Sequence, residues 1–404
     1  MTKFSLMSER THAAAIAPCP APAPADASVQ APAPGDAAAR LYHLDAMRSV
    51  LMLLGVVLHA LNPYAMDGDW LVADSQRSAA LGWLGAAIHL FRMPAFFVVA
   101  GYFAMLMLRR SSATGFLHDR LRRTLLPALA VLLSFNLVQV WFLAPAAADG
   151  LVLRALLPAL RSGDWLGHLW FLVDLAVYCM ALAALRPWLR GVWGRRLHAA
   201  LGRQWVLPAL LALAILVPLA NAAAAHLAPA LAGQVAGLVN PEELLDYAPF
   251  FVAGCLLQLD RAVLRRFSRA GPGVWAGGAL AGTALALPTT GAAALALAIV
   301  ARALLAWCLV RIVFAGFLRF TDMPSRTFRY LSDASYSIYL FHHLWVVVVA
   351  TWLLALPWPA EGKFAVVLGV ATALALAMHH FLVRPFPRMR WLFNGRPPPR
   401  SGPG

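Results

Sequence analysis

Ionisable side chains recur inside the most apolar stretches of this sequence. Arg48 and His59 lie in HLDAMRSVLMLLGVVLHA, Arg92 interrupts HLFRMPAFFVVAGYF, and His342 and His343 lie in SYSIYLFHHLW. A charged side chain within hydrocarbon costs roughly 2.5–3.5 kcal/mol on insertion scales, so such residues usually face a cavity and have a function. Imidazole exchanges protons near neutral pH, and guanidinium pairs with carboxylate or phosphate. The pattern therefore predicts acid–base chemistry on an anionic substrate.

The composition defines the elements that must position these side chains. Of the 404 residues, 61% are hydrophobic and only 13% are charged, against roughly 25% charged in an ordinary soluble domain. This excludes a soluble globular enzyme and indicates a polytopic, all-α membrane helix bundle. The apolar segments predict about ten transmembrane helices, at residues 46–64, 82–108, 124–144, 167–185, 204–222, 244–259, 272–288, 291–318, 334–357 and 363–383.

The basic residues predict the orientation of these helices. The N-terminal tail and every second loop together hold 25 of the 33 Lys and Arg residues, whereas the intervening loops hold Arg77, Arg154, Arg161 and Lys363. By the positive-inside rule both chain ends are cytoplasmic. Residues 1–39, rich in Ala and Pro, predict a disordered tail. We expect a membrane domain at 40–390 and a short cytoplasmic tail at 391–404.

With this orientation, helical rise gives the depth of each polar side chain. Arg48 begins at the cytoplasmic mouth beside Asp45, and His59 lies eleven residues further on, about 16 Å towards the outside. Arg92 falls near the midplane, about 15 Å from the outer end of its helix. The ninth helix brings its two adjacent histidines to a similar depth, and Arg302 also falls near the centre.

The fourth helix adds polar residues that descend from the outer rim, namely His168, Trp170 and Asp174. Cations and imidazoles from several helices thus share a layer that holds too few acids to pair them all. A purely structural alternative remains open, in which Arg48 pairs with Asp45 and His59 is satisfied by a neighbouring helix. Trp170 belongs either to the aromatic belt of the membrane interface or to a sugar-stacking site.

Several motifs resemble the acyltransferase 3 family of integral membrane acyltransferases. They are R-x10-H in the first helix, FRMPAFFVVAGYF in the second, FLHDRLRRTLLP before the third, HLWFL in the fourth and SYSIYLFHH in the ninth. They occur in order after residue 40. LYHLDAMRSVLMLLGVVLHALNPY, YAPFFVAGCLL and RPFPRMRWLFNGRPPP are most similar to a subgroup that succinylates osmoregulated periplasmic glucans. The resemblance implies a multi-pass protein of the bacterial inner membrane, with cytoplasmic acyl-CoA as donor and a periplasmic carbohydrate as acceptor.

The resemblance and the depths together suggest roles for individual residues. We expect donor binding by Asp45, Arg48, Arg122 and Arg123, because Arg forks suit CoA phosphates, although positive-inside anchoring also explains the loop arginines. His59 is the expected general base, with the acyl-histidine route as the alternative, and Arg92 binds the succinyl carboxylate or the thioester oxyanion.

The other candidates include a competing catalytic histidine and a set of substrate-binding residues. His342 is the competing catalytic residue. The expected substrate-binding residues are His168, Trp170, Asp174, Tyr336, His343 and Arg302. Arg302 lies outside the motifs that carry the resemblance, so its assignment depends on depth and charge alone.

Signals for metals and cofactors are weak. The sequence has no HExxH motif, no paired cysteines and no dinucleotide-binding fingerprint. Adjacent histidines diverge by about 100° on a helix and chelate poorly. We therefore expect no metal, no tightly bound cofactor and no nucleic-acid partner. Two further functions stay open: acetyl transfer to another envelope polysaccharide, and transport of an anion or proton along the Arg and His residues.

Overall fold

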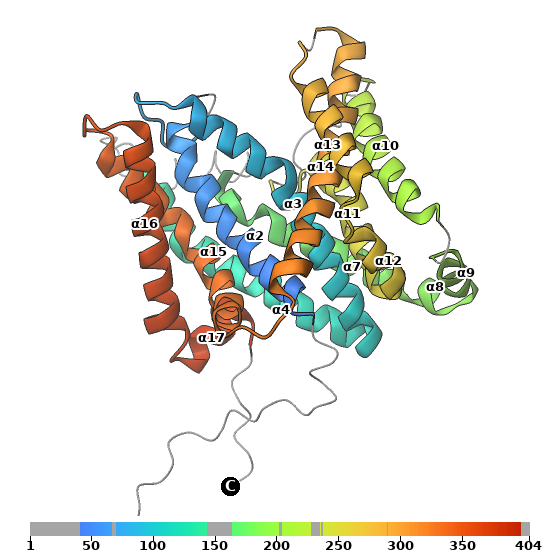
Figure 1. Cartoon of the computed structure of the whole chain (residues 1–404). Coiled ribbons are helices and arrows are strands. Elements are labelled where there is room, and N and C mark those ends of the chain that lie inside the picture. The colour runs from blue at the N-terminus through green and yellow to red at the C-terminus, as the bar shows by residue number, and fades with distance from the viewer. Residues whose placement is uncertain are drawn as a thin grey trace, which may run out of the picture. The chain divides into compact units, whose positions relative to one another are not determined.

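A computed structural model describes residues 41–66, 70–143, 164–201, 204–227, 235, 237–288 and 290–396. These residues form a bundle of helices joined by turns, with two isolated β-bridges and no β-sheet strand among them (Figure 1). The predicted all-α membrane bundle is confirmed. The expected tail at residues 1–39 lies outside the described residues, as do the loop residues Arg154 and Arg161.

Helices occur at all ten predicted positions. In chain order the structure has α2 (Tyr42–Leu61), η1 (Asn62–Tyr64), α3 (Ala79–Arg110), α4 (Ala113–Val131), η2 (Leu132–Asn136), α5 (Leu137–Leu143), η3 (Asp164–Leu169), α7 (Trp170–Ala184), α8 (Arg186–Arg190), α9 (Val192–Leu201), α10 (Val206–Leu227), α11 (Pro241–Leu259), α12 (Arg261–Phe267), α13 (Pro272–Leu285), α14 (Ala292–Thr321), α15 (Arg326–Leu353), α16 (Ala360–Met378), η5 (His379–Val383) and α17 (Pro387–Asn394).

Two of the ten differ from the rest in length or charge. Among the described residues, eight helical spans are long and apolar enough to cross a membrane. The other two are α11, which begins with Glu242, Glu243 and Asp246, and α13, which has only 14 residues. A straight helix of that length rises about 21 Å, short of a hydrocarbon core of about 30 Å. The predicted orientation of the chain ends stays a prediction.

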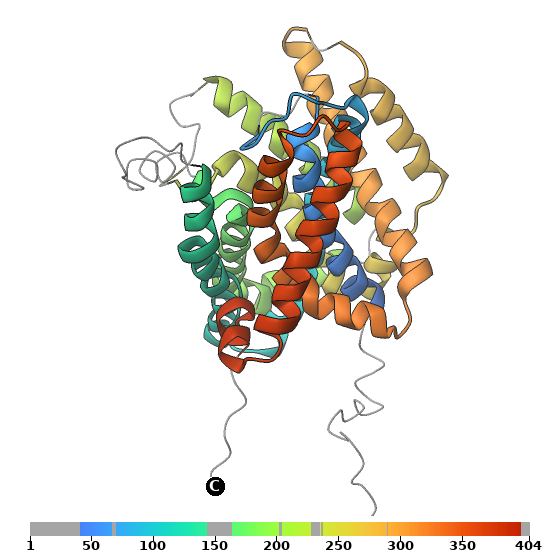
Figure 2. The ribbon, with the colours of Figure 1, turned by 90° about the vertical axis from the view of Figure 1, so that its left-hand side faces the viewer.

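Helix α2 lies in the middle of the bundle and contacts α3, α14, α15 and α16 (Figures 1 and 2). Its sequence is rich in Leu and Met and has no proline until Pro63, where the α-helix has given way to η1. Pro63 has no backbone N–H to donate to the carbonyl of His59, and its ring would clash with that carbonyl, which accounts for the end of the α-helix. The chain then turns and returns as α3, whose N-cap is Ser78.

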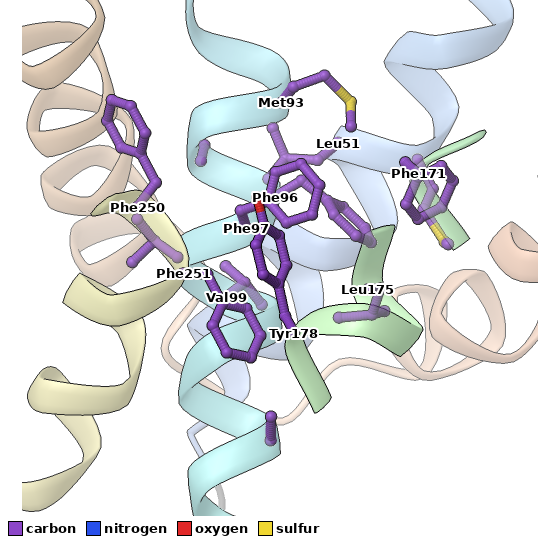
Figure 3. Close-up of a cluster of buried hydrophobic side chains, with 14 of the residues drawn as sticks. Leu51, Met93, Phe96, Phe97, Val99, Phe171, Leu175, Tyr178, Phe250 and Phe251 are labelled. Carbon is purple, nitrogen blue, oxygen red and sulfur yellow. The ribbon is translucent and has the colours of Figure 1, made fainter. Parts of the chain in front are cut away.

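An aromatic core joins α3, α7 and α11. Figure 3 shows Phe97 of α3 against Tyr178 of α7, with their ring centroids 5.4 Å apart. Phe96 contacts Phe171 at 5.0 Å, and Tyr178 stacks on Phe251 at 4.9 Å. Offset and edge-to-face pairs of this kind stabilise packing beyond their buried area. The core thus fixes the spacing of three of the helices that line the cavity described below.

The last helix crosses the expected boundary between the membrane domain and its tail. Helix α17 packs on α4, and Asn394 accepts a hydrogen bond of 3.1 Å from Ser337. Gly395 follows with φ = 60°, a conformation that favours glycine, and a Cβ there would meet the backbone of Arg122 and Arg123. Residues 391–395 are therefore part of the packed bundle.

Glycines let α3 and α11 approach each other closely. A Cβ at Gly101 would overlap the carbonyl oxygen of Phe251, and a Cβ at Gly254 would overlap that of Val98. Cys255 donates a hydrogen bond of 3.4 Å to the carbonyl of Gly101. Because hydrocarbon tails supply no hydrophobic drive for helix association, close backbone packing at small residues is a main source of stability here.

This contact predicts that alanine substitutions at two glycines, Gly254 and Gly369, differ strongly in their effect on stability. Gly254→Ala should force the two backbones apart and destabilise the protein by about 1–3 kcal/mol, the usual cost of overpacking. Gly369→Ala on α16 is the matched control, because no atom lies within 4 Å of its added Cβ. Thermal unfolding of both variants in the same detergent tests this. Equal midpoints would contradict the close contact.

Candidate functional site

Four histidines from three parts of the chain form one cluster. His59 lies near the end of α2, His168 in η3, and His342 and His343 on α15. The ring centroid of His59 lies 4.9 Å from that of His343, 5.3 Å from that of His342 and 6.1 Å from that of His168. The rings of His168 and His343 are stacked at 4.6 Å. The structure thus brings together His59, His342 and His343, which helical rise predicts at a similar depth, and His168, which the sequence predicts at the outer rim.

Backbone and amide contacts fix which ring nitrogens carry protons. Nδ1 of His342 lies 2.7 Å from the carbonyl oxygen of Tyr339, which can only accept, so this nitrogen must carry hydrogen. In the neutral ring Nε2 of His342 is then an acceptor, and it is buried without a hydrogen-bond partner. Nδ1 of His59 is likewise buried and unpartnered. Among the described residues each of these two histidines therefore presents a buried ring nitrogen without a partner, and either ring has the chemistry of a base.

Two buried amides on the third membrane span hold the cluster. Gln139 of α5 accepts a hydrogen bond of 2.7 Å from Nδ1 of His343. Asn136 of η2 donates to the carbonyl of Trp165 at 2.7 Å and so holds the turn that carries His168. Sequence reasoning missed both amides. Their signal was present, because uncharged polar side chains inside a span commonly bond neighbouring helices.

A buried ion pair holds an aromatic side chain over the same cluster. The ring of Trp70 lies 5.5 Å from that of His343 and 6.3 Å from that of His59. The segment that carries Trp70 is joined to α16 by Asp74 and Lys363, whose charged atoms are 2.6 Å apart and fully buried. Breaking a buried pair of this kind costs roughly 3–5 kcal/mol, so the contact firmly places this segment.

Arg92 lies close to the cluster and is held by α2. Only 7% of this residue is exposed, and its Nε donates a hydrogen bond of 3.1 Å to the carbonyl oxygen of Leu51. The guanidinium lies against Gly55, where a Cβ would overlap Nη2. Among the described residues no carboxylate pairs with Arg92. A buried cation without a counterion is suited to binding an anion.

His59 and Arg92 open onto one large cavity of about 1130 Å³ between α2, α3, η3, α7, α10, α11, α13 and α14. Among the predicted residues, His168, Trp170 and Arg302 also line it. Arg302 is exposed there and forms no hydrogen bond or ion pair with any described residue. Asp174 and Tyr336 are not among the residues that line this cavity. Asp174 is buried below it with an unpartnered Oδ2.

The cavity also has an acidic wall that the sequence analysis missed. Glu242, Glu243 and Asp246 at the start of α11 line it, as does Tyr247. Carboxylates in PEELLDY at the edge of an apolar segment were the available signal. The expectation that this layer holds too few acids to pair its cations stays a prediction, because these carboxylates line the cavity but none of them pairs with a Lys or Arg among the described residues.

The predicted donor-binding residues gather at the other end of α2. Arg48 donates a hydrogen bond of 2.9 Å to Ser332 and lies 4.0 Å from Asp45, so the expected pairing with Asp45 is present but long. Arg122 pairs with Asp119 at 3.1 Å. Tyr336 lies at this end, not in the cavity, because its hydroxyl donates to the carbonyl of Arg123 at 2.8 Å.

Arg120 completes this basic group. Its Nε and Nη2 are buried without hydrogen-bond partners, and its charge lies within electrostatic range of those of Arg48 and Arg123. Buried, mutually repelling guanidinium groups are stabilised when an anion binds among them. The four histidines thus lie near one end of α2, Arg92 lies against its middle, and a group of arginines lies at its other end.

Comparison with known proteins places this arrangement in a family. The acyltransferase domain of the acyltransferase 3 family matches residues 41–379, so the chain belongs to this family and is a multi-pass membrane acyltransferase. The glucans biosynthesis protein C of Salmonella agona and that of Salmonella typhi are each 26% identical over 384 residues, covering 89% of this chain and 96% of theirs. No solved structure matches the chain.

The position of Arg92 can be tested without changing Arg92 itself. Gly55→Ala should displace the guanidinium and lower kcat/KM of acyl transfer by about tenfold to a hundredfold, because small misplacements in a site are costly. Stability should change little, since only the far end of a flexible side chain has to move. Gly369→Ala serves as the control. Full activity of Gly55→Ala would show that this position of the guanidinium is not needed.

Proposed function

We propose that the protein transfers a succinyl group from succinyl-CoA, bound from the cytoplasm, to hydroxyl groups of a periplasmic glucan at the inner membrane. The observation that carries the proposal is the cavity that His59 and His168 of the histidine cluster share with a buried Arg92, which no carboxylate pairs among the described residues. Similarity to proteins named for glucan biosynthesis supports the acceptor. The succinyl donor follows from the match between its carboxylate and the unpaired guanidinium.

The reaction that suits this site is direct acyl transfer. His59 takes the proton of a sugar hydroxyl as its oxygen attacks the thioester carbonyl. The C–S bond breaks, and the departing thiolate of CoA receives the proton from the imidazolium. His342 orients His59, and Gln139 holds His343 beside it.

The donor is proposed to enter at the basic end of α2. Arg48, Arg120 and Arg123 receive the CoA phosphates, and the pantetheine arm extends along α2 towards His59, about 16 Å away. The excess of basic residues in alternate loops supports a cytoplasmic position for this end. The acceptor then approaches through the cavity from the periplasmic side.

Reconstituted vesicles test the proposed reaction against its competitors. With succinyl-CoA labelled in the succinyl group and purified glucan on opposite sides of the membrane, we expect label in the glucan. His59→Ala should abolish this transfer, whereas His380→Ala, which removes an exposed histidine outside the cluster, should not. Label that crosses while the glucan stays unmodified would indicate a transporter. Transfer from acetyl-CoA alone would reassign the acyl group.

A second test separates the two roles open to Arg92. Arg92→Lys keeps the charge but loses the planar fork, and it should cost roughly 1–3 kcal/mol of transfer efficiency with succinyl-CoA. The loss should be smaller with acetyl-CoA, which has no carboxylate to bind. Initial rates with both donors measure the difference. Equal losses would assign Arg92 to the thioester oxyanion and not to the succinyl carboxylate.

A further inference from the structure

The acidic wall of the cavity differs in charge from the wall that holds Arg92. Glu242, Glu243 and Asp246 occupy the first two turns of α11. Asn221 of α10 donates hydrogen bonds of 2.9 Å to the carbonyl of Glu242 and to a carboxylate oxygen of Asp246. Among the described residues, none of these three carboxylates has a Lys or Arg partner. This wall is therefore a source of unneutralised negative charge.

An aromatic platform belongs to the same wall. Trp170 of α7 and Tyr247 of α11 both line the cavity, and their rings are stacked with centroids 5.9 Å apart and planes inclined by 24°. Tyr247 is within electrostatic range of Glu243 and Asp246 and also of Arg92. Phe97 also stacks on Tyr247, with ring centroids 5.1 Å apart, so Trp170 is the member of the pair that offers a face to a ligand. An aromatic face near carboxylates suits a sugar, whose C–H face stacks and whose hydroxyl groups donate.

An independent observation indicates that the cavity takes a polar ligand. His168 lines it and is only 4% exposed, yet neither of its ring nitrogens has a hydrogen-bond partner among the described residues. Buried polar groups without partners are rare and costly, so a ligand hydroxyl is the expected partner. The volume of about 1130 Å³ exceeds the roughly 300–1,000 Å³ typical of pockets for small molecules, which leaves room for a sugar beside the acyl group.

We propose that this wall is the acceptor subsite and that its carboxylates select an uncharged sugar over one that already carries a succinyl group. The inference rests on the proposed function, because it takes a succinyl ester as the product. Esterification replaces a neutral hydroxyl by a group with a free carboxylate. A sugar that already carries a succinyl group at the acceptor position is repelled by the same carboxylates that accept hydrogen bonds from an unmodified sugar, so the modified sugar is not bound again in this position.

Equilibrium binding without any donor tests the proposal on the full-length protein in nanodiscs. The probes are a neutral glucan oligosaccharide and the same oligosaccharide with one chemically attached succinyl group. The wild type should bind the neutral probe more tightly, with each carboxylate contributing a factor of about three to ten at the effective dielectric constant of a protein surface. The preference should shrink at high salt.

Three variants separate charge from packing. Glu243→Gln should reduce the preference about threefold or more by tightening binding of the succinylated probe while binding of the neutral probe persists. Trp170→Ala should weaken both probes by a similar factor of about two to ten. Glu361→Gln, which removes an exposed carboxylate outside the cavity, should keep the wild-type preference.

The outcomes distinguish this proposal from the proposed function. Equal binding of the two probes by the wild type, or an unchanged preference in Glu243→Gln, would overturn the charge selection, and absence of binding of either probe would overturn the acceptor subsite. Succinyl transfer without this discrimination would overturn the charge selection alone. Discrimination by a protein that transfers no succinyl group would instead overturn the proposed function and leave the acceptor subsite in place.

Discussion

One hydrogen bond between α2 and α3 fixes the position of the buried positive charge of Arg92. The carbonyl oxygen of Leu51 accepts a hydrogen bond from Nε of Arg92, and the guanidinium lies against Gly55, one helical turn further along α2. A side chain at that position would cover the carbonyl, whereas glycine leaves it open to a second donor. The carbonyl neutralises none of the charge of Arg92. The guanidinium is therefore oriented by the protein but still requires an anion, which is the state that a binding group needs before its substrate arrives.

The packing of α3 fixes both walls of the cavity at once. The second half of α3 packs tightly against α11 at Gly101 and Gly254, so Arg92 and the carboxylates of α11 keep a set separation. The aromatic core then ties α7, with Trp170 at its start, to the same pair of helices. Rigid helices hold a constellation of side chains more accurately than loops do, and here the opposite charges stand on neighbouring rigid helices.

The sequence predicted those parts of the site that obey simple periodicity. Apolar length located the helices, and a rise of about 1.5 Å per residue put His59, Arg92 and His342 at a common depth. Periodicity does not show which faces of different helices meet. The roles of Gln139 and Asn136 depend on such contacts, and so does the position of Tyr336 beside Arg123. These features could not be derived from one helix at a time.

The acidic wall shows why the surroundings of charged side chains are harder to predict from sequence than the positions of apolar helices. Glu242 and Glu243 lie just before the apolar segment predicted at residues 244–259, where carboxylates are ordinarily solvated ends of a helix. In the structure they border a cavity. Helices α10 and α11 pack against each other, and in addition α11 packs against α3 and α10 packs against α14, so the start of α11 faces the space between these helices. The proposed transfer of an anionic acyl group to a neutral sugar requires a cation for the first and a hydrogen-bond acceptor for the second. Placing the cation on α3 and the acceptors on α11 keeps them from neutralising each other, and so each stays available for its own substrate.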